Sequence, residues 1–262
     1  MKIALHGATG RMGQALVRLI HQATDLELVG AVCAPDDPAL GQDVGVIAGV
    51  GSVGITASAD VGSSLLGAEV VIDFSSLKAL PTLLQHATRK RVPTVVCTTG
   101  LNSEQQAALH KAATEIPLLW AANTSLGVQV LAELVQQAVQ RLGAGYDVEI
   151  VEVHHRKKVD SPSGTAKRLG EAVKAARPNC NELYGREGIV GARTDEEVAI
   201  LAVRGGDVIG DHTVHLLGPG ERLEITHRAT SRELFAHGAL RAARFLATQP
   251  AGKLYAIADV LG

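Results

Sequence analysis

Residues 2–13, KIALHGATGRMG, form the stretch that decides the fold of the first half. A short apolar strand, Lys2–Leu5, leads directly into Gly7, Gly10 and Gly13, and helical spacing follows over Gln14–Gln22. Because glycine has no Cβ, such a turn lets a pyrophosphate approach the backbone, and the next helix points its N–H groups at it. This order of strand, glycine turn and helix predicts a dinucleotide-binding unit. The spacing differs from the standard Gly-x-Gly-x-x-Gly, so a turn that only reverses the chain is the alternative.

Alternating strands and helices continue to about residue 125. The second strand is expected at Leu26–Cys33, and helices are expected at Ser76–Arg89 and Ser103–Thr114. The remaining strands are expected at Glu69–Asp73, Thr94–Thr98 and Pro117–Ala121. This alternation predicts an α/β fold, a Rossmann-like doubly wound parallel sheet with helices on both faces.

Small polar segments follow three of these strands: Asp73–Ser76, Cys97–Gly100 and Ala121–Ser125. The carboxyl ends of parallel strands face the ligand crevice, so these segments are expected to line it, although any turn also favours such residues. The second strand ends in Cys33-Ala34-Pro35, where an acid usually binds the adenine ribose, and Asp36 and Asp37 come later. The choice between NAD and NADP therefore stays open.

The densest polar cluster of the chain runs from His154 to Thr165. It follows a predicted helix, Leu126–Leu142, and a predicted strand, Tyr146–His154. Imidazoles and lysines at its start favour an anionic ligand. The alternative is a charged loop that is only solvated. The His154-His155 pair has no third ligand at a suitable spacing, so no metal site is predicted.

The end of this cluster is expected to start a helix. Ser161 is a candidate cap, Pro162 fits the first helical position, and helical residues continue over Ala166–Ala176. The backbone N–H groups near Ser163, Gly164 and Thr165 are then available to an anion. Together with the basic start of the cluster, they predict a site for a small-molecule dicarboxylate.

The last third predicts a second α+β domain. Strands are expected at Glu197–Arg204, Val208–Leu217 and Arg222–Arg228, with glycine links that favour a mostly antiparallel arrangement. A capping box of Thr230 and Glu233 is expected to start a helix over Ser231–Ala247. The final residues, Lys253–Val260, are expected to return to the first domain.

Composition and charge limit the classes of protein to which the chain can belong. The chain has 262 residues, 46% of them hydrophobic, which suits two domains. Its net charge is −2 with only the short basic run Arg156–Lys158, which argues against nucleic-acid binding. No apolar run approaches the ~18 residues of a membrane span. Because the N-terminus also lacks a signal-peptide pattern, we expect a cytoplasmic protein, or the mature form of an organellar one. Cys33, Cys97 and Cys180 show no spacing of a disulfide framework or metal site.

Several segments resemble one family, 4-hydroxy-tetrahydrodipicolinate reductase, also called dihydrodipicolinate reductase. The most specific is VEVHHRKKVDSPSGTA, residues 151–166. The others are GATGRMG at 7–13, DFS at 73–75, TTG at 98–100, ANTS at 122–125 and GERLEITHRATSR at 220–232. The resemblance covers nearly the whole chain.

The resemblance implies a dinucleotide-binding domain of residues 1–125, onto which residues 235–262 pack back. It also implies a domain of residues 126–234 with an open mixed sheet, which binds substrate and assembles a homotetramer. The implied reaction is the reduction of 4-hydroxy-tetrahydrodipicolinate (dihydrodipicolinate) to tetrahydrodipicolinate with NADH or NADPH. This is a step of diaminopimelate and lysine biosynthesis.

The resemblance also implies roles for individual residues. His154 is the expected proton donor and Lys158 its cationic partner, while His155, Gly164 and Thr165 match substrate contacts. The expected cofactor contacts are Gly7, Ala8, Thr9, Gly10, Arg11, Met12, Cys97, Thr98, Thr99, Ala121, Ala122, Asn123 and Thr124. The family often has glycine where Cys97 stands, and often an acid near Ala34 and Pro35.

Two other functions are compatible with parts of the pattern. A semialdehyde dehydrogenase would use Cys97 as nucleophile and His155 as base. It would not explain the lysines or the anion site. A non-catalytic dinucleotide sensor would bind the cofactor without turnover and would leave the polar cluster unused.

Overall fold

The computed structural model describes all of residues 1–262 and divides into two compact units. The first unit joins Met1–Ser125 to Glu233–Gly262, and the second is the continuous stretch Leu126–Arg232. Each unit has its own sheet and core, and each is described by itself. No helix combines the length and hydrophobicity that crossing a bilayer requires.

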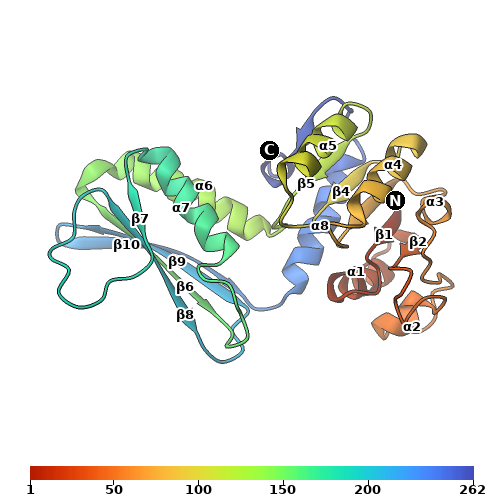
Figure 1. Cartoon of the computed structure of the whole chain (residues 1–262), viewed down its shortest axis with the longest axis horizontal. Coiled ribbons are helices and arrows are strands. Elements are labelled where there is room, and N and C mark those ends of the chain that lie inside the picture. The colour runs from red at the N-terminus through yellow and green to blue at the C-terminus, as the bar shows by residue number, and fades with distance from the viewer. The chain divides into compact units, whose positions relative to one another are not determined.

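The first unit contains a six-stranded sheet in the order β11-β5-β4-β3-β1-β2, and all of its pairs are parallel (Figure 1). This confirms the Rossmann-like sheet. Its strands are β1 (Lys2–His6), β2 (Glu27–Val32), β3 (Val70–Asp73), β4 (Thr94–Val96), β5 (Leu118–Trp120) and β11 (Leu254–Tyr255). Its helices are α1 (Arg11–Gln22), α2 (Val44–Ala48), α3 (Val61–Ser64), α4 (Leu80–Lys90), α5 (Ser103–Ala113) and α8 (Glu233–Leu246), with a 3-10 turn at Ile257–Val260.

The sheet is buried on both faces, as an all-parallel sheet requires. Apolar residues of α3, α4 and α5 form one core with alternate strand residues. On the other side, α8 packs against α1 and against β3, β4 and β5 (Figure 1). The last strand, β11, pairs with β5 and forms the edge of the sheet. The final 30 residues therefore belong to the first unit's sheet and core.

The second unit contains a five-stranded sheet in the order β10-β9-β6-β8-β7. Its strands are β6 (Asp147–His154), β7 (Asn181–Leu183), β8 (Glu197–Arg204), β9 (Gly210–Gly218) and β10 (Glu221–Ala229). Two helices, α6 (Leu126–Leu142) and α7 (Gly164–Ala176), share its core and lie on one face of the sheet (Figure 1). A short 3-10 turn, Gly143–Gly145, follows α6.

The strand directions in this sheet correct one expectation. β9 runs antiparallel to β6 and β10, but β8 runs parallel to both β6 and β7. β6 lies between β8 and β9, so the Gly205-Gly206 link spans a strand instead of closing a tight hairpin. The mixed sheet is confirmed, whereas a mostly antiparallel arrangement is wrong.

Several helix starts also differ from the sequence prediction: α1 begins at Arg11 instead of Gln14, and α8 begins at Glu233 instead of Ser231. Ser163 caps α7, because its Oγ accepts a hydrogen bond from the Ala166 N–H, so neither Ser161 nor Pro162 has its predicted role. In the first unit α4 begins at Leu80, with Pro81 in its first turn, instead of at Ser76. Proline fits that position because the first N–H groups of a helix have no intrahelical partner.

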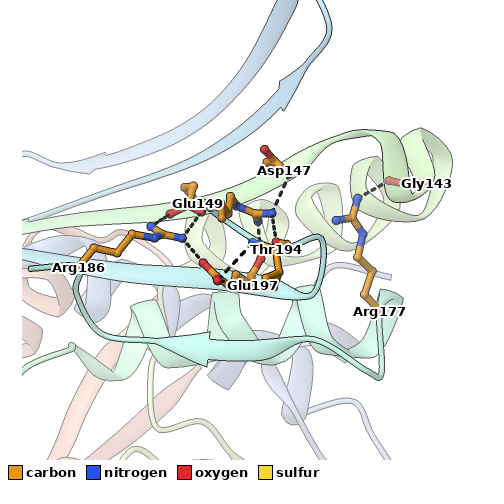
Figure 2. Close-up of polar contacts among 8 residues, drawn as sticks. Gly143, Asp147, Glu149, Arg177, Arg186, Thr194 and Glu197 are labelled. Atoms are coloured by element: carbon orange, nitrogen blue, oxygen red, sulfur yellow. Dashed lines mark hydrogen bonds and ion pairs between the residues drawn. The ribbon is translucent and has the colours of Figure 1, made fainter. Parts of the chain in front are cut away.

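The face of the second sheet that carries no helix is crossed by the segment 184–196. Arg186 donates to the carboxylates of Glu149 and Glu197, at 2.8–3.1 Å (Figure 2). Arg193 donates to Asp147 at 2.7 Å and to Glu149 at 3.0 Å. These ion pairs fasten an otherwise irregular segment to β6 and β8.

Candidate active site

A crevice opens at the carboxyl ends of the first unit's strands. The strand order reverses at β1, which has β2 on one side and β3 on the other, and such a switch point is where open α/β sheets bind ligands. A cavity of about 560 Å³ lies there. Its lining includes His6, Gly7, Thr9, Gly10, Cys33, Ala34, Pro35, Asp36, Asp37, Phe74, Ser75 and Lys78.

The glycine turn leaves room that side chains would fill. Gly7 has φ +83°, and a Cβ there would stand 2.7 Å from the Phe74 carbonyl oxygen. A Cβ on Gly13 would stand 2.3 Å from the Gly7 carbonyl oxygen, so α1 packs on the turn only because this residue is glycine. No side chain caps the start of α1 at Gly10. This turn fits a dinucleotide, since it offers a close backbone approach and the positive end of a helix to the diphosphate.

A second cavity, of about 290 Å³, continues the crevice along β4 and β5. It shares Phe74 and Ser75 with the first. Its other lining residues are Met12, Cys97, Thr98, Thr99, Ala121, Ala122, Asn123, Thr124 and Phe235. The predicted cofactor residues therefore line one or other cavity, except Ala8, which is buried, and Arg11, which is exposed outside the lining.

A buried carboxylate organises the floor of this crevice. The Asp73 carboxylate, at the end of β3, lies 2.8 Å from Nδ1 of His6. It also accepts a hydrogen bond of 2.7 Å from the Thr98 hydroxyl. The Ser75 hydroxyl also donates to it. Asp73 thus ties the ends of β1, β3 and β4 together. Asp73 belongs to the segment Asp73–Ser76 that was expected at the crevice, whereas His6, the last residue of β1, was not predicted.

The environment of Cys97 argues against a catalytic thiol. Cys97 is buried, and burial, followed by the nearby Asp73 carboxylate, raises its pKa well above the ordinary value. A nucleophilic cysteine needs the thiolate, which a lowered pKa would favour. Cys97 is therefore a lining residue, and the semialdehyde dehydrogenase alternative loses its nucleophile.

Two acids lie at the outer end of the first cavity. Asp36 and Asp37 both line it, next to Ala34 and Pro35. Asp37 is held in place by the Thr9 hydroxyl of the glycine turn at 2.6 Å and by the Ala39 N–H at 2.8 Å. The acid that the second strand lacks at Ala34 is thus present two and three residues later.

The second unit builds its polar cluster from the alternation of β6. Val148, Ile150, Glu152 and His154 are buried, while the residues between them are partly exposed. Val148 and Ile150 belong to the core beneath α6 and α7. The same strand face therefore changes from apolar to polar towards its carboxyl end, where Glu152 and His154 lie.

Glu152 is fully buried and accepts hydrogen bonds from three other parts of the unit. Its carboxylate lies 2.5 Å from Nδ1 of His154 and accepts a hydrogen bond of 3.0 Å from the Ser163 N–H. Arg204 of β8 donates to both of its oxygens, at 2.7 and 2.8 Å. Burial acts to raise the pKa of Glu152, but the bonds from Arg204, His154 and Ser163 outweigh it and lower the pKa. Glu152 is therefore a carboxylate anion.

Burial lowers the pKa of His154, although the hydrogen bond and charge of Glu152 oppose that effect. A second imidazole, His212 of β9, packs edge-on against it with the ring centroids 5.1 Å apart. Burial lowers the pKa of His212 to about 4, so this ring is neutral near pH 7. Its Nε2 lies 3.1 Å from the Ser163 hydroxyl.

The other predicted residues of the cluster lie in the loop between β6 and α7 and at the start of α7. Lys158 Nζ bonds both carboxylate oxygens of Asp160, at 2.8 and 2.9 Å, and the Lys158 N–H donates to the His155 carbonyl. Gly164 is exposed, and a Cβ there would meet nothing within 4 Å. Thr165 is half-buried beside it.

The anion site at the start of α7 is smaller than predicted. The Ser163 N–H is taken by Glu152, so it does not contribute a free donor. The open space at Gly164 remains compatible with the approach of a carboxylate. No group of three or more His, Cys, Asp or Glu side chains is placed to hold a metal ion.

Both halves of the chain match one family. Residues 1–124 match the description "Dihydrodipicolinate reductase, N-terminus", and residues 127–261 match "Dihydrodipicolinate reductase, C-terminus". The chain belongs to the dihydrodipicolinate reductase family. The resemblance first seen in residues 151–166 and in the glycine turn is thereby confirmed, and the family is one of oxidoreductases.

Relatives of full length carry the same name. A 4-hydroxy-tetrahydrodipicolinate reductase of Anaeromyxobacter sp. (strain Fw109-5) is 48% identical, over 100% of this chain and 98% of that protein. One of Syntrophotalea carbinolica is 46% identical, over 100% and 99%. Among solved structures, a dipicolinate-bound dihydrodipicolinate reductase of Paenisporosarcina sp. TG-14 has a TM-score of 0.77 at 24% identity, over 98% of this chain and 97% of that one. This structure supports the dihydrodipicolinate reductase fold.

Proposed function

We propose that this chain reduces dihydrodipicolinate, formed by dehydration of 4-hydroxy-tetrahydrodipicolinate, to tetrahydrodipicolinate with NADH or NADPH. The reaction is a step of diaminopimelate and lysine biosynthesis. The observation that carries the proposal is the buried Glu152–His154 pair, 2.5 Å apart, beside the open start of α7. The names of the full-length relatives support the same substrate.

The first unit binds the dinucleotide in this proposal. The turn from Gly7 to Gly13 and the start of α1 hold the diphosphate, because no side chain caps the N–H groups at the start of this helix. Cys97–Thr99 and Ala121–Thr124 line the part of the crevice for the nicotinamide. When bound, the reduced nicotinamide supplies the hydride.

The second unit supplies the proton and holds the dicarboxylate. His154 donates the proton as a general acid, and Lys158 stabilises the negative charge that develops on the ring. Gly164 and Thr165 bind one carboxylate at the start of α7, and His155 contributes a further contact. Lys158 exchanges its bonds to Asp160 for bonds to substrate, since both carboxylate oxygens of Asp160 occupy it here.

An assay with enzymatically generated substrate, run with NADH and NADPH side by side, tests this function. We expect substrate-dependent oxidation of at least one dinucleotide, with tetrahydrodipicolinate as product. If neither is oxidised above the substrate-free rate while dinucleotide binding is intact, the chain is not this reductase. That result would favour a non-catalytic dinucleotide sensor.

We further propose that NADH is the better cofactor. Asp36 and Asp37 line the cavity near the end of β2, where the adenine ribose binds in such folds, and Lys78 is the only lysine or arginine in the lining. A 2′-phosphate there would face two negative charges. Removing them in a D36N/D37N variant should shift the NADH-to-NADPH ratio of kcat/KM towards NADPH by roughly fivefold, about 1 kcal/mol. An unchanged ratio would refute this preference.

We also propose a homotetramer assembled through the helix-free face of the second sheet, as the family resemblance implies. Val203 and Leu217 are exposed on strands β8 and β9, at 48% and 36%. They lie near opposite ends of the sheet, beside Val153 and Asp147 of β6, so they test two separate parts of this face. Sedimentation of the wild type should give four times the chain mass, and a V203E/L217E variant should give a smaller species. A cytoplasmic location remains part of the proposal.

A further inference from the structure

The most connected polar group of the second unit is one for which the proposed chemistry has no role so far. The Glu152 carboxylate is completely buried, and its two oxygens accept from an imidazole, a backbone N–H and a guanidinium. Burying a carboxylate is costly unless it is paired and hydrogen-bonded. A carboxylate bound to the imidazole of a proton donor commonly holds that ring in one orientation.

We propose that Glu152 is the positioning residue of this site, holding the His154 ring with Nε2 as the reacting nitrogen and tying it to the start of α7. This inference rests on the proposed function, because it takes His154 as the proton donor. It assigns Glu152 a role without contact to substrate or cofactor. Arg204 is the counter-ion that keeps Glu152 charged.

The hydrogen bond fixes the tautomer of the imidazole. A carboxylate anion can only accept, so Nδ1 of His154 must carry the hydrogen that lies between them at 2.5 Å. Nε2 is then the nitrogen that gains or loses a proton. A free ring would divide its protons between both nitrogens and both ring orientations.

The surroundings of Nε2 fit this assignment. Nε2 faces Gly210, the first residue of β9, and a Cβ on Gly210 would stand only 2.9 Å from it. His212, two residues on, packs edge-on against the ring, and its Cε1 would stand 3.5 Å from the same Cβ. Glycine at this position therefore keeps side-chain atoms away from the reacting nitrogen.

Glu152 is also the one negative charge acting on His154 among its charged neighbours. The others are Lys158 in the loop, Arg204 on β8 and the neutral His212 on β9, and burial adds to the effect of the two cations. Burial, Lys158 and Arg204 lower the pKa of His154, while the hydrogen bond and charge of Glu152 raise it. Without Glu152 the imidazolium would lose its main support.

The same carboxylate orients the anion-binding end of the cluster. It accepts from the Ser163 N–H, and Ser163 in turn caps α7. Arg204 bonds the Asp160 carbonyl as well as Glu152, so the loop that carries Lys158 is fastened to the same pair. Glu152 and its partner Arg204 thus fix the positions of the proton donor, the start of α7 and the loop relative to one another.

A Glu152→Gln variant of the full chain tests this role, with Glu149→Gln as the matched control. Glu149 lies on the same strand and also pairs with arginines, but on the opposite face. The readouts are the pH profile of kcat and the imidazole signals of ¹⁵N-histidine protein without substrate. The His154 signals are assigned by their loss in His154→Ala.

In Glu152→Gln we expect kcat to fall roughly 100-fold, part of what a general acid contributes. The imidazole pKa should fall by about 1 unit or more, because an opposite charge has gone. The protonated ring is the active form, so the alkaline limb of the profile should move to lower pH. The Nδ1–H tautomer should lose its dominance, and Glu149→Gln should change none of these values.

Glu152→Asp keeps the charge but shortens the reach, and it serves if the glutamine variant does not fold. It should retain the alkaline limb near its wild-type pH while kcat falls. A wild-type imidazole pKa, tautomer and pH profile in a folded Glu152→Gln protein would overturn the proposal and make Glu152 purely structural. The imidazole signals are independent of turnover. If His154→Ala were fully active while Glu152 still set the tautomer, the role of His154 as proton donor would fail, and Glu152 would orient a ring that the reaction does not use.

Discussion

The two candidate binding regions of this chain depend on different chemical groups. The crevice of the first unit depends on backbone and on missing side chains, as at Gly7 and Gly13, whose Cβ positions are already occupied by carbonyl oxygens. The cluster of the second unit depends on side-chain charge, with Glu152, Arg204 and His154 joined in one buried network. The first region should therefore be sensitive to added atoms, and the second to lost charges and lost proton donors.

The largest effect is expected where the chemistry itself is removed. His154→Ala and Lys158→Ala should each lower kcat roughly 100-fold or more, the scale of general-acid catalysis. Dinucleotide binding, followed by fluorescence titration of NADH, should stay near wild type because both residues belong to the second unit. Near-normal turnover in both variants would contradict the assignment of the site.

Adding one methyl group should damage the backbone-built region. Gly13→Ala would place Cβ 2.3 Å from the Gly7 carbonyl oxygen, so α1 and the turn must separate. We expect NADH binding to weaken roughly tenfold or more, and unfolding to become easier by about 1–3 kcal/mol, the usual cost of overpacking. Gly145→Ala is the control, since a Cβ there meets nothing within 4 Å. Equal behaviour of the two variants would refute this reading of the turn.

A methyl group can also break the charge-built region at one point. Gly210→Ala would bring Cβ to 2.9 Å from His154 Nε2 and push the ring against its bond to Glu152. We expect kcat to fall about tenfold, since misplacing a catalytic group by about 1 Å can cost up to a hundredfold. The affinity for NADH should not change. Gly205→Ala, with open space around its Cβ, should keep full activity; a comparable loss there would point to the loop instead.

The smallest effect is expected for the charges on the open face of the second sheet. Arg186 pairs with Glu149 and Glu197, but its side chain is 31% exposed and solvent screens the pairs (Figure 2). Arg186→Gln should cost at most about 1 kcal/mol of unfolding free energy in a urea titration. Turnover should be unchanged. A large loss of kcat would show that charge on this face also serves the reaction.

Local patterns predicted the first unit well for a physical reason. Strand, glycine turn and helix are neighbours in sequence, so their spacing alone indicates the parallel sheet and most of the crevice lining. The order of strands in the second sheet was harder, because the Gly205-Gly206 link resembles a hairpin while β6 inserts between the strands it joins. No residue near Gly205-Gly206 indicates that β6 lies between β8 and β9.

The candidate site divides in the same way. His154 and Lys158 stand out in a dense polar segment, whereas Arg204 and His212 reach the cluster from β8 and β9, about 50 positions further along the chain. Glu152 had a local signal that went unused. It lies two residues before His154 on an alternating strand, which places both side chains on one face. The cap of α7 was misplaced because Ser161 and Ser163 are equally good capping residues, and only the buried bond to Glu152 selects the second.

The return of the C-terminal segment to the first unit has a consequence for synthesis on the ribosome. Helix α8 contributes buried residues to the first unit's core, and Gly238 lies so close to the Thr124 carbonyl that a Cβ would stand 1.8 Å from it. These contacts and the edge strand β11 are made only after residues 126–232 have left the exit tunnel. All residues of the second unit are therefore synthesised before the first unit can be completed, and a product truncated before Glu233 contains the whole second unit but lacks α8 and β11 of the first.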